Sequence, residues 1–399
     1  MTGSATGTAA SGFTAEGASA QLRPIPVARP RRQLTDAQRL AWLRLIRSEN
    51  VGPVTFREML NHFGGAVEAL QALPELSRRG GQRRTIRICP ASEAERELER
   101  AAKTGARLTA LDETGYPPLL AVIEAPPPVI YLRGRAELLE RPVIAMVGAR
   151  DASAAGRKIT LQIGSALGAG GIVVTSGLAR GIDTAAHQAA LPTGTIAVLA
   201  GGIDIVYPPE NKDLHQAIAA EGILVAENAP GLEPRGRDFP RRNRLISGMA
   251  LAVLVVEAAK RSGSRITADF AREQGRMVFA VPGNPLDPRA AGTNQLIKEG
   301  ARLVTDANDI VAGLGPALSG FSTEKIALAT AAEPAPMMPR IAQTDRDRIL
   351  EGLGPAPIEL DELVRMTGVG VREARIVLLE LDLAGRIERF GGQRVAIKS

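Results

Sequence analysis

The sequence predicts an α/β protein in which a parallel sheet with helices on both faces is flanked by a helical domain before it and a smaller domain after it. A chain of 399 residues exceeds one hydrophobic core, so two or three domains are expected. Between residues 141 and 313, apolar runs rich in Val and Ile alternate with helical stretches. Strands covered on both faces read as nearly continuous apolar runs. The predicted strands are PVIAMV, GIVVT, TIAVLA, GILVAE, ALAVLVVE, RMVFAVP and ARLVT.

Bulk composition narrows the class of protein. The hydrophobic share of 45% and a mean hydropathy of 0.00 are typical of a soluble globular protein. No stretch approaches the roughly 20 uninterrupted apolar residues of a membrane span, so no membrane partner is expected. The net charge of +6 favours a polyanionic partner. A single cysteine, Cys89, excludes an intramolecular disulfide and a multi-cysteine zinc site, which fits a cytoplasmic location.

Three segments precede the predicted sheet. Residues 1–33 are rich in Gly, Ala, Ser and Thr and lack the order of a secretory signal, so we expect a disordered tail. Residues 34–110 repeat apolar positions at helical spacing behind Thr35 and resemble a small helical domain of the SAM or helix-hairpin-helix kind. A packing role and a DNA-binding role both stay open for it. Residues 111–140 are broken by prolines and predict an extended connector.

Two segments follow the sheet. Residues 314–342 are rich in Pro and Ala and predict a linker. Residues 343–399 predict three helices and then a hairpin, which is the order of a winged helix. This segment holds nine Lys or Arg against ten Asp or Glu, whereas a DNA-reading domain is usually more basic. Its third helix carries Arg372, Arg375 and Glu380, and either a DNA groove or a protein surface would suit it.

The loop after the first central strand, and the rest of the sequence, lack the motifs of several common enzyme classes. It reads Gly148, Ala149, Arg150 and then Ser153 before a helix, which suits a loop that opens onto a helix N-terminus. A dinucleotide site would need GxGxxG there and an acidic residue after the next strand, and both are missing. The Walker pattern and the GxSxG elbow are also missing. The three histidines are too far apart in the sequence to indicate a catalytic triad or a metal site; they are His62, His187 and His215. We therefore expect no catalytic residue, no metal and no cofactor.

Three polar side chains have structural explanations. We expect Asp183 to accept backbone N–H groups at a helix start, where a carboxylate also suits the helix dipole. His187 follows one turn later, and we expect it to buttress a loop rather than form a catalytic pair. Glu257 ends a strand, and we expect it to orient one of the cations of the following loop, which are Lys260, Arg261 and Arg265.

An arginine-rich string carries the strongest chemical signal. Residues 235–244 read RGRDFPRRNR, with five arginines and one aspartate. Such dense like charge favours a bound anion, and a phosphate backbone satisfies this. Phe239 adds a ring on which a base could stack, worth roughly 1–3 kcal/mol. The alternative, a core position for Phe239 with arginines paired to distant carboxylates, stays open.

These strings together resemble a known family. VGAR, SGLARGIDTAAH, AVLAGGIDIVYPPEN, FPRRNRLISG, VVEAAKRSGSRITADFA, VFAVPGN and GTNQLIKEGA occur in the order found in the extended Rossmann domain of the DNA-processing protein A (DprA/Smf) family. The flanking helical domain and the winged helix are similar to those of its longer members.

The resemblance implies a homodimeric protein without enzymatic activity that binds single-stranded DNA and loads RecA on incoming DNA during natural transformation. At two positions the chain departs from the family, with Ala149 where serine is frequent and Gly236 where lysine is common. The DNA-binding residues expected from the resemblance and the basic loops are Gly148, Ala149, Arg150, Ser176, Gly177, Arg180, Gly181, Arg235, Arg237, Phe239, Arg241, Asn243, Arg244, Lys260 and Arg265.

Two other classes stay open. Rossmann-like hydrolases that cleave nucleoside monophosphates also place glycine loops, an arginine and a glutamate at the sheet edge. Their PGGxGTxxE string is missing here, and Glu257 is the nearest substitute, with Arg265 beyond it. A regulatory adaptor that binds an acidic protein tail would also use a cationic cleft.

Overall fold

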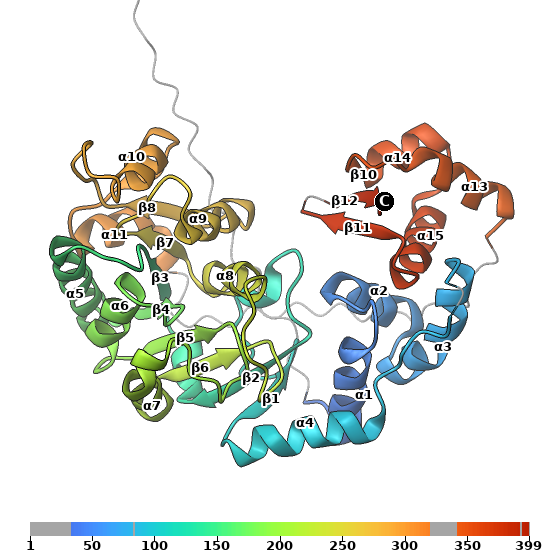
Figure 1. Ribbon diagram of the computed structural model, residues 1–399, viewed down its shortest axis with the longest axis horizontal. Coiled ribbons are helices and arrows are strands. Elements are labelled where there is room, and N and C mark those ends of the chain that lie inside the picture. The colour runs from blue at the N-terminus through green and yellow to red at the C-terminus, as the bar shows by residue number, and fades with distance from the viewer. Residues whose placement is uncertain (1–32, 83, 320–340, 392, 399) are drawn as a thin grey trace, which may run out of the picture.

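The computed structural model describes residues 33–82, 84–319, 341–391 and 393–398. All but the last residue of the predicted tail, residues 1–33, and most of the predicted linker, 314–342, lie outside these described residues. Figure 1 shows the α/β domain on the left and the N-terminal and C-terminal domains side by side on the right.

One large sheet organises the α/β domain. Within the described residues it has nine strands in the order β1-β2-β6-β5-β4-β3-β7-β8-β9, and all pairs from β6 to β9 are parallel. All seven predicted strands are present, as β3 to β9. Their bounds are β3 Val143–Val147, β4 Val173–Ser176, β5 Thr195–Leu199, β6 Ile223–Ala226, β7 Ala252–Val255, β8 Met277–Ala280 and β9 Arg302–Leu303.

The connector, residues 111–140, was predicted to be extended, and part of it is a strand of the sheet. It contributes β2, Val129–Gly134, which pairs antiparallel with β6. The preceding segment adds β1, Arg107–Ala110, antiparallel to β2. Short 3-10 helices follow at Leu120–Val122 and Ala136–Glu140. The prolines of the connector fall between these elements, so the extended segment joins the sheet as its antiparallel edge.

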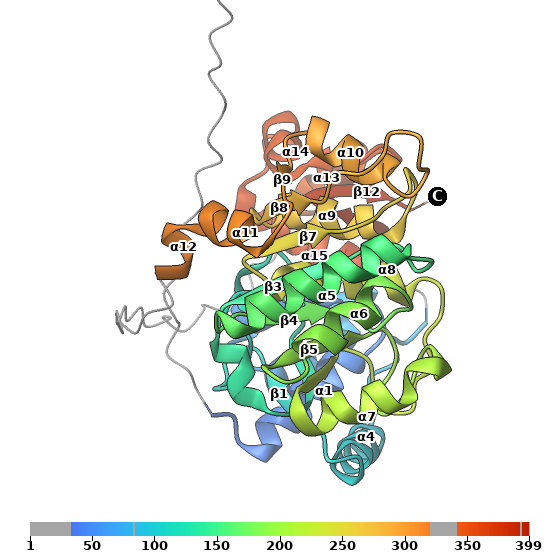
Figure 2. The same cartoon turned by 90° about the vertical axis from the view of Figure 1, so that its left-hand side faces the viewer.

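Helices cover both faces of the sheet, as its apolar strands require. On one face, side chains of β3 to β7 pack on α8 and α9. On the other face, β3, β4 and β7 pack on α5, α6 and α11, and β5 and β6 pack on α7. Figure 2 shows α5 and α6 in front of the central strands. The helix bounds are α5 Ala154–Ala169, α6 Ile182–Ala190, α7 Lys212–Glu221, α8 Asp238–Met249, α9 Gly263–Glu273, α10 Ala291–Lys298, α11 Ala307–Leu314 and α12 Pro316–Ser319.

The N-terminal domain is helical, as predicted. Its first helix begins behind Thr35, whose side chain accepts the Gln38 N–H in a capping box. Phe56, Leu70 and Leu73 belong to its core. The helices are α1 Asp36–Arg47, α2 Pro53–Phe63, α3 Ala66–Arg79 and α4 Ala91–Lys103.

The C-terminal domain has the predicted winged-helix order. Its third helix, α15, docks on the N-terminal domain, because Leu379 and Leu383 share that domain's core. Of the two partners left open for this helix, a protein surface is the one it contacts, and that surface belongs to its own chain. The elements are α13 Gln343–Gly352, β10 Ile358–Glu359, α14 Leu360–Thr367, α15 Val371–Leu383, β11 Ile387–Phe390 and β12 Arg394–Ile397.

No helix in the described part of the chain is both long and apolar enough to cross a membrane.

Candidate nucleic-acid interface

The strand order creates a crevice at one edge of the sheet. From the central strand β3 the chain moves outward in one direction through β4, β5 and β6, and later in the other through β7, β8 and β9. Loops after β3 and its neighbours therefore diverge, and ligands of open α/β sheets bind in the crevice that results.

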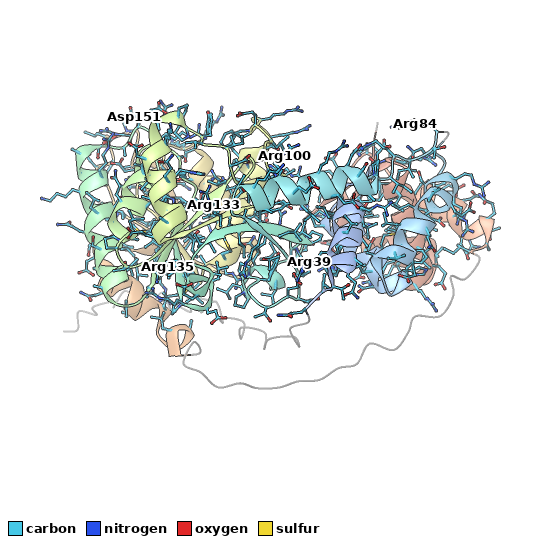
Figure 3. The ribbon with its side chains drawn as sticks, turned by 90° about the horizontal axis from the view of Figure 1, so that it is seen from below. Arg39, Arg84, Arg100, Arg133, Arg135 and Asp151 are labelled. Atoms are coloured by element: carbon cyan, nitrogen blue, oxygen red, sulfur yellow. The ribbon has the colours of Figure 1, made fainter. Side chains whose placement is uncertain are left out.

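Two adjoining depressions lie there, with volumes of about 720 and 530 Å³. They share Arg150 and Asp151, and we call them together the cleft. The larger is lined by, among others, Gly148, Ala149, Phe239, Arg242, Asn243, Ser262, Ser264 and Arg289. The smaller is lined by, among others, Arg157, Arg180, Gly181, Thr184, Gln188 and Asn211. Figure 3 shows Asp151 at the opposite end of the molecule from Arg84 of the N-terminal domain.

Glycines let the first two loops touch. A Cβ on Gly148 would lie 2.5 Å from Cγ1 of Ile182, so a larger residue would push the loop away from α6. Gly181 has φ +77°, and a Cβ there would collide with the carbonyl oxygen of Ala149. The Ile182 N–H donates to that same carbonyl at 3.2 Å. The loop Gly148–Ala149–Arg150, which we call the GAR loop, is thus held against the start of α6.

Glu257 has a different role from the predicted one. Its carboxylate accepts the Ser153 backbone N–H at 3.0 Å and the Ser153 hydroxyl at 2.5 Å. The Ser153 side chain in turn caps α5 by accepting the Gly156 N–H. Glu257 therefore anchors the loop after β3. The expectation that it orients one of the basic-loop cations is wrong, because the carboxylate faces Ser153.

Asp183 and His187 organise the second loop, as predicted. The Asp183 carboxylate accepts the backbone N–H groups of Gly177 at 3.1 Å and Ala179 at 3.3 Å. Burial raises the pKa of Asp183, while the nearby Arg242 and these hydrogen bonds oppose the rise. His187 is fully buried, and its Nε2 accepts the Leu178 N–H at 3.3 Å. Its Nδ1 lies 2.7 Å from the Thr195 hydroxyl, so the ring buttresses the loop.

Arg242 is the arginine that the sequence analysis missed. It is 7% exposed, and its guanidinium donates to the Gly177 carbonyl at 2.5 Å and also to the Val198 carbonyl. Burial lowers its pKa to about 10, although Asp183 acts in the opposite direction. It joins α8 to the ends of β4 and β5 and places a cation in the wall of the cleft.

The side chains of Arg150 and Tyr207 both pack on Phe239, which lines the larger depression, whereas Tyr207 itself lines neither depression. The guanidinium carbon of Arg150 lies over the Phe239 ring, 5.5 Å from its centroid. The Tyr207 ring lies 5.2 Å from Phe239 on the other loop, with an interplanar angle of 52°. Among the described residues no carboxylate forms an ion pair with Arg150, so its charge faces the cleft.

Eight of the fifteen predicted contact residues do not line the cleft, and four of these have other environments that the structure defines. Arg244 is held by both oxygens of Glu227, at 2.6 and 2.7 Å, and by the Ala125 carbonyl. Arg241 is exposed and borders a separate small depression. The Ser176 hydroxyl is buried on the Met146 carbonyl at 2.6 Å. Arg265 turns to Glu299 at 3.2 Å. Arg241 and Arg244, expected with Arg150 as contacts to DNA, therefore do not share the cleft with it.

The remaining predicted residues are divided between the loops and the surface. Gly177 lies under Arg242, where a Cβ would be 2.6 Å from the guanidinium, so it shapes the loop. Asn243 lines the cleft and donates to the Gly263 carbonyl at 3.2 Å. Arg180 lines the smaller depression, 3.9 Å from Glu210. Arg235, Arg237 and Lys260 are exposed.

Helical spacing carried a signal for Arg242. Because neighbouring residues on one helix face are three or four positions apart, Phe239, Arg242 and Ile246 share a face of α8. All three line the cleft. Arg157, Gln188 and Arg289 also line it, and no local sequence pattern marks them.

No cluster of His, Cys, Asp or Glu in the described part of the chain could hold a metal ion. The cleft is lined by cations, backbone amides, hydroxyls and the ring of Phe239, together with the carboxylates of Asp151 and Asp183. The cations, amides, hydroxyls and ring suit a phosphate chain with exposed bases.

Three family models match this chain, one for each of its domains. Residues 107–315 match the family model described as DNA recombination-mediator protein A. Residues 36–100 match a DprA-like N-terminal HHH domain, and residues 333–393 match a DprA winged helix domain.

Individual relatives cover most of the chain. Protein Smf of Synechocystis is 32% identical over 400 residues, covering 90% of this chain and 99% of that protein. DNA processing protein DprA of Streptococcus pneumoniae is 44% identical over 199 residues, covering 49% of this chain and 70% of that protein. The X-ray structure of the Streptococcus pneumoniae protein covers 70% of this chain and 98% of its own, with a TM-score of 0.58 and 33% identity. The chain therefore belongs to the DprA/Smf family of DNA recombination-mediator proteins.

Proposed function

We propose that this protein binds single-stranded DNA in the cleft without breaking a covalent bond. It then loads RecA on the bound strand, either on incoming DNA in natural transformation or in recombination. The observation that carries the proposal is the continuity of the two depressions through Arg150 and Asp151. A strand can follow one depression into the next, with the unpaired guanidinium of Arg150 between them.

The groups in the cleft suit an unpaired strand. Loop backbone and hydroxyls at Gly148, Ala149 and Ser262 face the larger depression, and guanidiniums occupy both. These groups recognise phosphate and the flat face of any base, so we expect little sequence preference.

The test is a titration of labelled oligo-dT with the full-length protein, followed by fluorescence anisotropy. Arg150→Ala is expected to weaken binding roughly ten- to 150-fold, since a charge-assisted hydrogen bond contributes about 1.5–3 kcal/mol. The matched control is Arg96→Ala, which removes an exposed arginine from α4 outside the cleft. Unchanged affinity for Arg150→Ala, or equal affinity of the wild type for duplex DNA, would overturn the proposal.

The partners follow from the same proposal. We place the protein in the cytoplasm as a homodimer that presents two clefts to one strand and to RecA. Light scattering after size exclusion measures the dimer. RecA-dependent ATP hydrolysis on single-stranded DNA, with and without this protein, measures loading. Incubation with nucleoside monophosphates is expected to release no free base, and turnover would support the hydrolase class instead.

A further inference from the structure

The ring of Phe239 is less open to a base than its position in the sequence suggested. Arg150 covers a face of this ring at 5.5 Å, and Tyr207 packs on it at 5.2 Å. Phe239 is itself partly buried at the start of α8. A base that stacked on Phe239 would have to displace one of these two neighbours.

The ring of Tyr207 is more open to solvent than that of Phe239. It lies in the loop between β5 and the 3-10 helix Pro209–Asn211, and it is 46% exposed. The two other tyrosines of the chain, Tyr116 and Tyr131, are buried. The Tyr207 ring packs on Phe239, which also contacts Arg150. An aromatic ring that is fixed by one neighbour and almost half exposed is a suitable platform for a flat base.

We propose that Tyr207 provides the base-stacking surface for single-stranded DNA, with Phe239 as its support and Arg150 as the cation for the adjacent phosphate. This inference rests on the proposed function, and it names the residue that contacts the bases at the same site. The ligand group is an unpaired nucleobase of any type, because the contact uses the π face rather than a pattern of hydrogen bonds.

Stacking on the ring and hydrogen bonding through the hydroxyl make different predictions. Tyr207→Ala is expected to weaken binding of oligo-dT roughly five- to 150-fold, which corresponds to the stacking of one base. Tyr207→Phe retains the ring and is expected to bind within about twofold of the wild type, since the hydroxyl is not used. Phe390→Ala, at an exposed aromatic residue of the wing, is the matched control and is expected to bind as the wild type does.

An abasic oligonucleotide of the same length separates the base contact from the phosphate contact. With abasic DNA, the difference between wild type and Tyr207→Ala is expected to disappear, whereas the effect of Arg150→Ala persists. If Tyr207→Ala binds oligo-dT as tightly as the wild type while Arg150→Ala is impaired, the stacking assignment fails and the proposed function stands. If Arg150→Ala is also unimpaired, the proposed function fails with it.

A cross-linking measurement does not depend on any variant folding. A strand carrying 5-iodouracil is irradiated in complex with the wild-type protein, and the modified peptide is identified by mass spectrometry. We expect the adduct on the peptide containing Tyr207. An adduct confined to Phe239, or to peptides that neither contain Tyr207 nor line the cleft, would overturn the assignment.

Discussion

Arginines that are neighbours in the sequence have different environments in the structure. Arg241 is exposed, Arg242 is buried on loop carbonyls, and Arg244 is paired with Glu227. A helix turns by about 100° per residue, so consecutive side chains face different surroundings. Each residue therefore has its own expected phenotype.

Arg244→Ala is expected to lower stability rather than DNA affinity. The side chain and its partner Glu227 are 15% and 19% exposed, so the substitution leaves a largely buried carboxylate without its cation. A loss of about 2–3 kcal/mol in the free energy of unfolding is expected. Denaturant unfolding measures it. Arg135→Ala, which breaks the exposed pair with Glu137, is the control and is expected to change stability little. A normal midpoint with impaired DNA binding would contradict this assignment.

His187 is expected to make stability depend on pH. Burial, together with the Arg242 charge, lowers its pKa from 6.5 to about 3. Because the folded pKa lies below the unfolded pKa, the stabilising effect of the neutral ring is complete above pH 6.5 and is lost as the pH falls toward 3. Between pH 7 and 4 the loss amounts to about 3 kcal/mol.

The measurement compares wild type with His187→Gln at both pH values. The variant is expected to lose less of its unfolding free energy than the wild type between pH 7 and 4, whatever its stability at pH 7. An equal loss in both proteins would show that this imidazole does not titrate as inferred.

At the scale of elements, α15 is an interdomain contact. Thr55 of α2 donates its hydroxyl to Asp382 at 2.6 Å, and Asn50 donates to the Leu383 carbonyl at 3.0 Å. Arg389 of the wing bonds to both Glu58 and Asp382. These apolar and charged contacts occupy one face of α15, whereas Arg372 and Arg375, which were considered for a DNA groove, are exposed.

Gly80→Ala is expected to loosen this contact. Gly80 lies at the end of α3, and a Cβ there would collide with the Glu380 carbonyl of α15. Since backbone cannot move aside as easily as a side chain, we expect a cost of about 1–3 kcal/mol. Hydrogen exchange should then increase in α3 and α15 together. Gly52→Ala, where a Cβ meets open space, is the control. Unchanged exchange in Gly80→Ala would contradict the docking.

At the scale of the whole molecule, charge placement matters more than the net charge of +6. Many arginines pair with carboxylates far from the cleft, as Arg47 does with Glu97 and Arg346 with Glu380. Arg150 and Arg157 line the cleft without a partner among the described carboxylates. We therefore expect any affinity for polyanions to be confined to the cleft rather than spread over the surface.

Salt dependence is expected to reveal this local contact. Each phosphate neutralised on a single strand contributes about −0.7 to the slope of log K against log salt. With two or three guanidiniums on the strand, the wild-type slope should be about −1.4 to −2.1, and Arg150→Ala should reduce its magnitude by about 0.7. Anisotropy titrations between low and high salt give the slopes. An identical slope in the variant would show that Arg150 does not contact phosphate.

Local patterns predicted the elements well, because their causes are local. Continuous apolar runs identified β3 to β9, and Thr35 and Ser153 marked helix starts by their capping chemistry. The GAR loop and Phe239 were placed in the site from loop composition, and both line the cleft. Strand β2 escaped prediction because prolines dominate the connector and its pairing with β6 is a long-range contact. Strand β1 escaped because it ends the segment predicted as helical and is defined by its pairing with β2.

The sequence by itself determined the three domains, the parallel sheet and the loops that meet at its edge, since periodicity, capping and glycine content act over a few residues. Only the tertiary structure decided which cations face the cleft. Arg242 lies in the wall of the cleft because it bonds to the Gly177 carbonyl. Arg244 lies outside the cleft because it pairs with Glu227. Ion pairing and burial depend on the positions of groups in space, and no local pattern encodes those positions.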